Sequence, residues 1–281
     1  MKDLFNQVSY NCSKLVTQKY SSSFSLAARM LAPEIRWAVY NIYGFVRFAD
    51  EIVDTLHDFD KEALLFEFEK NYYTGKLQGI STNPILNSFI HTVNKYNIED
   101  ELIKSFLNSM KADLHKSEYK TKDEYNKYIY GSANVVGLMC LRVFVKGEQK
   151  KYQELRVAAI RLGSAFQKVN FLRDLKEDIQ VLNRSYFPNV NFKMLSKASK
   201  DEIIKEIEDD FNYAYKHGVL KLPVEAKLGV YIAYKYYRKL LNKLKSVPSS
   251  QIMDTRIRIS NILKISLLMR GYARYKLNLL E

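Results

Sequence analysis

The chain has 281 residues, of which 47% are hydrophobic and 27% are charged, with a formal net charge of +13. It contains 10 Gly and 5 Pro, where average usage would give roughly 20 and 14, so the composition favours long helices over a β fold with many turns. The 2 Cys exclude a disulfide framework, and the longest apolar run, residues 135–141, is too short to span a membrane.

The first residues carry no apolar segment of the kind that a signal peptide needs, so we expect a cytoplasmic protein. Helical periodicity then runs from end to end of the chain. Ser21–Ser23 offer helix caps, and Pro33 predicts the start of a helix that ends near Thr55. Three further helices are predicted over residues 60–73, 83–96 and 97–115.

The second half of the chain continues the same pattern. A helix is predicted over residues 125–145, with Gly131 and Gly137 at an interruption or a tight packing contact, and a long helix over 150–182. Residues 183–195 predict a loop, and three more helices follow at 200–217, 223–246 and 252–277. Because no segment alternates with period two, we predict an all-α fold in which residues 1–281 form a single domain.

Positive charge is concentrated in the last helices. From Lys216 to Glu281 there are fourteen Lys or Arg against three acidic residues, a net +11, and the rest of the chain carries only +2. Such a surface suits nucleic acid, an anionic membrane or a phosphorylated substrate, although a solvated lysine-rich helix face is the simpler interpretation. Charge alone does not decide between these alternatives.

Two pairs of aspartates with i,i+4 spacing are the most informative feature of the sequence. The first pair is Asp50 and Asp54, and the second is Asp174 and Asp178. Residues four apart lie on one face of a helix, so each pair presents two carboxylates side by side. Each pair continues a polar stripe, traced through Tyr40, Tyr43 and Arg47 in the first helix and through Gln167 and Asn170 in the second.

An isolated pair of this kind is usually a solvated helix face. Here both pairs lie among apolar neighbours, and each has an arginine nearby, Arg47 or Arg173, which favours a shared functional site. Two carboxylates about 6 Å apart repel by roughly 3 kcal/mol at an effective dielectric constant near 20, so four enclosed together need cations. Oxygen ligands without Cys or clustered His favour Mg²⁺, which prefers one or two carboxylates plus phosphate oxygens. The stripes therefore predict a magnesium site that takes a diphosphate substrate.

Other catalytic signatures are missing from the sequence. The four His are scattered without an HExxH motif and the two Cys are far apart, which argues against zinc. There is no Walker loop and no GxGxxG motif, and Ser21–Ser23 have no neighbouring His to activate a nucleophile.

In these residues the sequence resembles the squalene/phytoene synthase family of head-to-head prenyl transferases. Five motifs carry the resemblance in the expected order and span nearly the whole chain. They are SxSF at Ser21–Phe24, RxxDExxD at Arg47–Asp54, YxYGSANVVG at Tyr128–Gly137, QxxNxxRDxxED at Gln167–Asp178 and NRSYFP at Asn183–Pro188.

The resemblance implies a helical fold around a central hydrophobic channel, with the two aspartate motifs facing each other across its mouth. It also implies a reaction in two steps. Loss of diphosphate from one prenyl diphosphate gives an allylic cation, and the double bond of a second attacks it to give a cyclopropyl diphosphate. This intermediate then ionises, rearranges and loses a proton. The leaving group calls for a metal and arginines, and the cation calls for a dry cavity with aromatic faces.

The resemblance further implies a role for each site residue. Mg²⁺, for which Mn²⁺ is a possible substitute, would be held by Asp50, Asp54, Asp174 and Asp178, and Tyr128 would lie near the reacting carbons. Substrate contacts are implied for Ser21, Ser23, Arg47, Gln167, Asn170, Arg173 and Arg184. Many relatives have a cation where this chain has Ser22, and further candidate contacts to diphosphate are Arg256, Arg258 and Lys264.

The expected substrate follows from the same resemblance. Bacterial members of this size more often join two geranylgeranyl diphosphates to phytoene, and without a nucleotide motif we expect no NADPH. Dehydrosqualene or squalene from farnesyl diphosphate is the alternative, followed by a class I terpene cyclase and a non-enzymatic basic helical protein that binds membranes. Among partners we expect prenyl diphosphates and no nucleic acid, with peripheral contact to the inner membrane surface as a further hypothesis.

Overall fold

A computed structural model describes residues 1–182, 184–188 and 195–280 of the protein. Within those ranges every regular element is a helix, so the predicted all-α fold is confirmed. The helices of the first half are α1 (Lys2–Tyr20), α2 (Ser22–Ala28), α3 (Pro33–Asp54), α4 (Lys61–Gln78), α5 (Pro84–Tyr96) and α6 (Asp100–His115).

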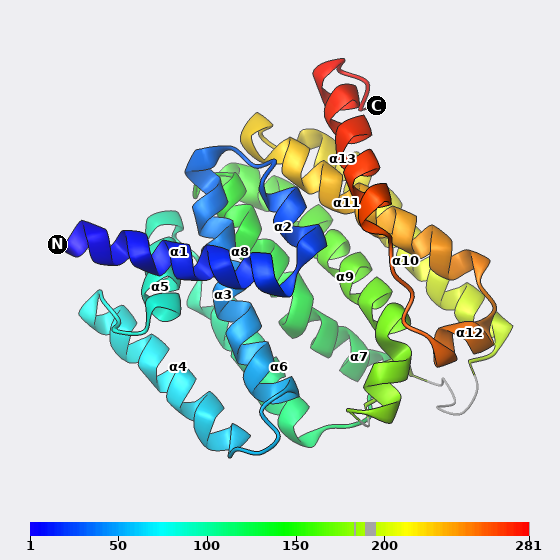
Figure 1. The fold of residues 1–281 in the computed structure, drawn as a ribbon, viewed down its shortest axis with the longest axis horizontal. Helices are drawn as coiled ribbons and strands as arrows, with labels where there is room; N and C mark the ends of the chain where they lie inside the picture. The colour runs from blue at the N-terminus through cyan, green and yellow to red at the C-terminus, as the bar shows by residue number, and fades with distance from the viewer. Residues whose placement is uncertain (183, 189–194, 281) are drawn as a thin grey trace.

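The second half adds longer helices and two short irregular ones. These are α7 (Lys122–Ile129), the π-helix η1 (Tyr130–Asn134), α8 (Val135–Phe144), α9 (Gln149–Gln180), α10 (Lys197–His217), the 3₁₀-helix η2 (Val219–Lys221), α11 (Val224–Ser246), α12 (Ser249–Asp254) and α13 (Asn261–Lys276). In Figure 1, α3, α8 and α9 run through the middle of the molecule, with α4 and α5 on one side and α10 to α13 on the other.

Side-chain caps explain where several helices begin. Ser21 accepts a hydrogen bond from the backbone N–H of Phe24 at the start of α2, and Thr121 and Glu124 form a capping box at the start of α7. Pro33 is the first residue of α3, where a proline N–H is not needed. The predicted start at Pro33 is therefore confirmed.

The prediction of a single helix over residues 252–277 is wrong. The structure has two helices there, α12 and α13, joined by an extended segment that begins at Thr255. The sequence T-R-I-R-I-S of this segment is rich in β-branched residues, which disfavour a helix, and its last residue, Ser260, caps α13 by accepting from the N–H of Leu263.

The helix predicted over residues 125–145 is interrupted at Gly131, as predicted, by the π-helix η1. A Cβ on Gly131 would lie 1.9 Å from Oγ of Ser109, so the glycine lets η1 pack directly against α6. Of the predicted loop 183–195, residues 183 and 189–194 lie outside the described residues. The described part is non-helical, and Ser185 forms an isolated bridge with Glu118.

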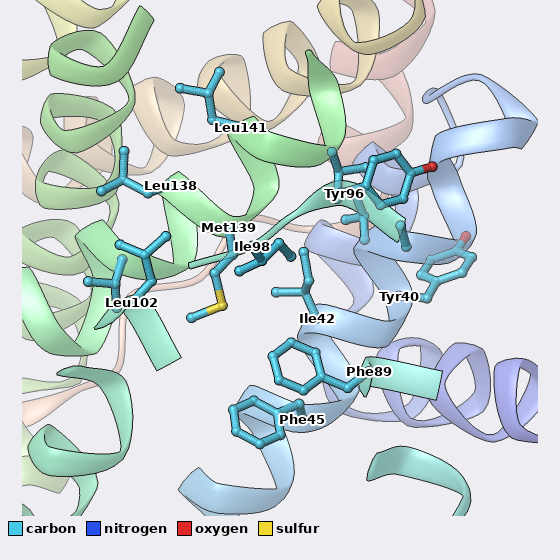
Figure 2. Close-up of a cluster of buried hydrophobic side chains, with 14 of the residues drawn as sticks. Tyr40, Ile42, Phe45, Phe89, Tyr96, Ile98, Leu102, Leu138, Met139 and Leu141 are labelled. Atoms are coloured by element: carbon cyan, nitrogen blue, oxygen red, sulfur yellow. The ribbon is translucent and has the colours of Figure 1, made fainter. Parts of the chain in front are cut away.

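Two buried hydrophobic clusters hold the central helices. Figure 2 shows part of the first cluster, in which Phe45 of α3 stacks on Phe89 of α5 with ring centroids 4.0 Å apart. In the second cluster Phe171 of α9 stacks on Tyr186, also at 4.0 Å. Because α8 packs against both α3 and α9, the two helices that carry the aspartate pairs are fixed relative to each other.

Candidate active site

A cavity of about 1050 Å³ lies between α2, α3, α6, α8, α9 and α11. This volume is at the upper end of the range for sites that bind small molecules, roughly 300–1000 Å³. Its lining changes along its length. The N-terminal halves of α3 and α9 contribute apolar residues such as Val39 and Leu155, whereas their C-terminal halves contribute the aspartates. The cavity is thus apolar at one end and acidic at the other, and the acidic end is called the mouth below.

On α3 the predicted polar stripe lines the cavity from Tyr43 to Asp54. Tyr43, Arg47, Asp50 and Asp54 all belong to the lining. Tyr40 departs from the stripe, because its ring is buried and packs edge-on against Trp37. Four of the five residues assigned to this stripe therefore share the cavity.

On α9 the whole predicted stripe lines the cavity. Gln167, Asn170, Asp174 and Asp178 follow one another toward the mouth. The amide oxygen of Asn170 accepts a hydrogen bond of 3.2 Å from the hydroxyl of Tyr237, whose ring stacks on Phe166 at 4.1 Å. Tyr237 on α11 thereby fixes the orientation of the Asn170 amide, a contact that sequence reasoning missed.

Arginines pair with three of the four aspartates. Nη1 of Arg47 lies 2.5 Å from Asp50, and Nη1 of Arg184 lies 2.6 Å from Asp54. Asp174 receives two arginines, Arg173 with its Nε at 2.8 Å and Arg256 with its Nε at 2.7 Å. The mouth therefore alternates carboxylates with guanidinium groups, which have the planar geometry that binds phosphate well.

The carboxylates at the mouth still crowd one another. Burial, together with the charges of Asp174 and Asp54, raises the pKa of Asp178 to about 8. The side chain of Asp50 is 36% exposed, but into the cavity, and burial together with the charge of Asp54 raises its pKa to about 7. Asp54 therefore acts on a carboxylate of each helix, so the two motifs meet at the mouth, and an added cation would stabilise them.

The donor chemistry of the mouth fits Mg²⁺ completed by a phosphorylated ligand. Among the described residues no three Asp, Glu, His or Cys side chains form a ready-made metal cluster. Mg²⁺ is usually bound by one or two carboxylates together with waters and substrate phosphates, rather than by an all-protein cage. Asp50 and Asp54 on one side and Asp174 and Asp178 on the other provide carboxylates of this kind.

Asp113 is a site residue that sequence reasoning missed. It lies on α6, lines the cavity and is 7% exposed, and its carboxylate accepts hydrogen bonds from the hydroxyls of Tyr128 at 2.6 Å and Tyr119 at 3.2 Å. Burial raises its pKa to about 7. The available signal was the spacing of Phe106, Met110 and Asp113, which places an acid on the apolar face of a helix.

Tyr128 lies on α7 beside the mouth, in a group of aromatic rings. Its ring is 5.1 Å from that of Tyr186 and 6.0 Å from that of Phe171, and burial raises the pKa of its hydroxyl well above the ordinary value. Arg184 donates to the backbone carbonyl of Asp113 at 2.9 Å as well as to Asp54. Arg184 thus links the Tyr128 group to the aspartates.

The three serines of the entry motif line the cavity next to α13. Ser21 caps α2, and the hydroxyl of Ser22 accepts a hydrogen bond of 2.7 Å from Nζ of Lys264. Lys264 of α13 therefore brings a cation to Ser22. Ser22 occupies the motif position at which many relatives carry a cation of their own. Burial lowers the pKa of Lys264, and the positive charges of Arg173 and Arg258 lower it further, so these cations lie close together.

The predicted substrate contacts Ser23, Arg256 and Arg258 also line the cavity. Gly137 lines it too, and a Cβ there would lie 3.2 Å from the carbonyl oxygen of Ala159 on α9. Gly131 is explained by helix packing alone. Every site residue that the sequence predicted, Arg184 excepted, belongs to the cavity lining, and Arg184 contacts the lining residue Asp54.

Comparison with known proteins agrees with this geometry. The chain matches the profile described as squalene/phytoene synthase over residues 17–262. It is 27% identical over 248 residues to phytoene synthase 1 of Solanum lycopersicum, an alignment covering 82% of this chain and 60% of the tomato protein. It is 23% identical over 261 residues to phytoene synthase of Arthrospira platensis, covering 84% of each. The chain thus spans about three fifths of the length of the tomato relative.

Solved structures share the fold. A dehydrosqualene synthase superimposes with a TM-score of 0.84 at 22% identity, covering 96% of this chain and 98% of that one. Squalene synthase HpnC from Alicyclobacillus acidocaldarius superimposes with a TM-score of 0.74 at 16% identity, covering 90% and 97%. At these identities the likeness shows a common helical fold.

Proposed function

Because the chain belongs to the squalene/phytoene synthase family, we propose that it is a magnesium-dependent prenyltransferase that joins two geranylgeranyl diphosphates head to head into phytoene. The observation that carries the proposal is the cavity that is acidic and arginine-rich at its mouth and apolar beyond it. A prenyl diphosphate has the same division, with an anionic head and a long hydrocarbon tail.

The mouth would bind and activate the diphosphate. Mg²⁺, when held by the aspartate pairs of α3 and α9, supplies positive charge to a leaving group that departs as an anion. Arg47, Arg173 and Arg256 already lie at the mouth and pair with its carboxylates. Phosphate oxygens can replace carboxylate oxygens on these guanidinium groups, so the arginines would orient the diphosphate and stabilise its developing charge.

The walls beyond the mouth would protect the carbocation. Apolar side chains exclude water, which would otherwise capture an allylic cation. The faces of Tyr128, Phe171 and Tyr186 are stacked beside the mouth and can stabilise positive charge on carbon. The hydroxyl of Tyr128 is bonded to Asp113, which holds the ring in position.

The length of the cavity supports a twenty-carbon substrate. Leu155 and Asp174 both line it and are nineteen residues apart on α9, which corresponds to about 28 Å along the helix axis. The alternative is farnesyl diphosphate, condensed to dehydrosqualene or squalene. This alternative is favoured by the structural similarity to a dehydrosqualene synthase.

Incubation of the purified protein with each labelled prenyl diphosphate tests the proposal. With geranylgeranyl diphosphate and Mg²⁺, and without NADPH, we expect a forty-carbon hydrocarbon, and chelation with EDTA should abolish it. A thirty-carbon product from farnesyl diphosphate alone would change the substrate and leave the reaction class intact. A cyclic product from one substrate would identify a terpene cyclase, and no hydrocarbon from either substrate would contradict the enzymatic proposal.

We also propose that the protein works at the surface of a lipid bilayer, because both the prenyl tail of the substrate and the hydrocarbon product are lipids. In the part of the chain that the structure describes, no helix is long and apolar enough to cross a membrane.

A further inference from the structure

A stripe of large apolar side chains on α13 faces solvent. Ile262, Ile265, Met269 and Tyr272 are 83%, 56%, 62% and 43% exposed. Their spacing of three, four and three residues puts all four on one face of the helix. Single exposed apolar residues are common on protein surfaces, but four aligned over three turns are not.

The opposite face of α13 is already packed. Gly271 is buried, and a Cβ there would lie 2.3 Å from Cδ1 of Ile232 on α11. The hydroxyl of Tyr236 donates to the backbone carbonyl of Lys264 at 2.9 Å. The helix is thus held on α11 by one face while the stripe points away, along the outer edge of the molecule where α13 runs in Figure 1.

The charges around the stripe favour an anionic partner. Between Asn261 and Lys276 the helix carries four basic residues and no acid. Beside its first turn lies a second cavity, of about 310 Å³, lined by Lys239, Lys243 and Arg258 together with Leu263, and no acidic residue lines it. Apolar side chains that can enter the acyl boundary, flanked by cations that attract anionic headgroups, are the features of an interfacial helix.

A second copy of this chain is a poorer occupant of the same face. Pairing two such helices about a two-fold axis would bring four positive charges against four, with no acid in either helix to compensate. An anionic bilayer can bury the apolar stripe and pair its headgroups with the positive charges. We infer that the stripe of α13, with the basic cavity beside its first turn, is the surface that docks the protein on an anionic phospholipid bilayer.

This surface lies next to the candidate active site. Lys264 and Asn261 of α13 line the large cavity, and Arg258 and Ile259 line both cavities. The inference rests on the proposed function only for the reason to dock, since an enzyme with lipid substrates gains from an entrance at the bilayer. The docking itself follows from the stripe and the charges and can be measured without substrate.

Vesicle flotation of the full chain tests the surface. The variant I265Q/M269Q removes two apolar side chains from the stripe and keeps the net charge, and L4Q/V8Q is its matched control, since Leu4 and Val8 are 67% and 49% exposed and also four apart, on α1. With vesicles of phosphatidylglycerol and phosphatidylcholine in equal parts, we expect I265Q/M269Q to bind about tenfold more weakly or worse, and L4Q/V8Q to bind like the parent.

Three results of the flotation assay would overturn the assignment. These are equal binding of the parent and I265Q/M269Q, an equal loss in L4Q/V8Q, and binding to phosphatidylcholine alone that matches binding to the mixture and does not fall as salt is raised. Sedimentation that finds a dimer of the parent, broken by I265Q/M269Q, with no vesicle binding, would assign the face to a second copy. Turnover in detergent micelles, expected to be unchanged in both variants, separates a failure of docking from a failure of the proposed reaction.

Discussion

The mouth and the far end of the large cavity are built from the same helices but have opposite effects on the stability of the fold. At the far end, α3, α8 and α9 contribute apolar residues that also belong to the buried core, so what suits a prenyl tail also stabilises the fold. At the mouth, the same helices carry crowded carboxylates whose pKa values are raised because their charged forms are unfavourable there. Groups that cost stability and are nonetheless kept together indicate a functional site, which supports the proposed binding of cations and phosphate.

Removing a carboxylate from the mouth is the strongest test of this difference between the two ends of the cavity. Replacing Asp50 or Asp174 with Ala should lower turnover by about a thousandfold or more, because the leaving group loses the positive charge that the carboxylates recruit. In Asp50→Ala the change also relieves repulsion between carboxylates, so the melting temperature of that variant should stay the same or rise.

Steady-state kinetics and thermal denaturation measure the two effects. Asp58, which is exposed just beyond α3, provides the control variant Asp58→Ala, for which turnover should be unchanged. If Asp50→Ala and Asp174→Ala were as active as Asp58→Ala, the mouth would have no metal-binding role.

A bulky residue in the far end should change the product instead of the rate of ionisation. Ala159 lines the cavity fifteen residues before Asp174, about 22 Å away along α9. A phenylalanine at position 159 would shorten the space for the tail, so Ala159→Phe should strongly reduce the forty-carbon product and retain condensation of farnesyl diphosphate.

Chromatography of the products from each substrate distinguishes these results. Val157 is exposed on the outer side of α9, so Val157→Phe adds the same ring outside the cavity and should leave the products unchanged. An Ala159→Phe enzyme that still makes only the forty-carbon product would show that this part of the cavity does not hold the tail.

The sequence predicted more of the mouth than of its surroundings, for a physical reason. The i,i+4 spacing of Asp50 with Asp54 and of Asp174 with Asp178 is a local property of helices, and a local pattern can be read without knowing what packs around it. Tyr237 reaches the site only through packing between distant helices, so nothing in its own neighbourhood marked it, and the one local signal for Asp113 was its place on the apolar face of its helix. The break between α12 and α13 was missed for a different reason, because the helical period continues across residues 255–260 while their β-branched residues favour an extended chain.

The stability of the protein should depend on pH through the buried Asp113, which lies beside the mouth. Its pKa in the folded protein, about 7, lies above the ordinary aspartate value of 3.8, so the folded state holds this proton more tightly than the unfolded state does. The contribution of this proton to the free energy of unfolding is complete below pH 4 and is lost as the pH rises through 7. Asp113→Asn cannot ionise, so it should gain stability relative to the parent between pH 4 and 8, by a few kcal/mol at most.

Urea denaturation of both proteins across this pH range measures the difference in the free energy of unfolding. The control is Asp58→Asn, whose stability relative to the parent should not change with pH in this way. A constant difference between Asp113→Asn and the parent from pH 4 to 8 would mean that Asp113 does not titrate in this range.

The smallest expected effect is that of Tyr128→Phe, which distinguishes the role of the Tyr128 ring from that of its hydroxyl. Tyr128→Phe keeps the aromatic face beside Phe171 and Tyr186 and removes the hydrogen bond to Asp113, which should cost about 1 kcal/mol of stability. If the ring face stabilises the carbocation, turnover should fall only a few-fold, whereas Tyr128→Leu should lower it much further because the face is lost. Equal and large losses of turnover in both variants would instead assign the role to the hydroxyl and its bond with Asp113. The comparison thus decides whether Tyr128 belongs with the charged groups of the mouth or with the apolar walls that begin beside it.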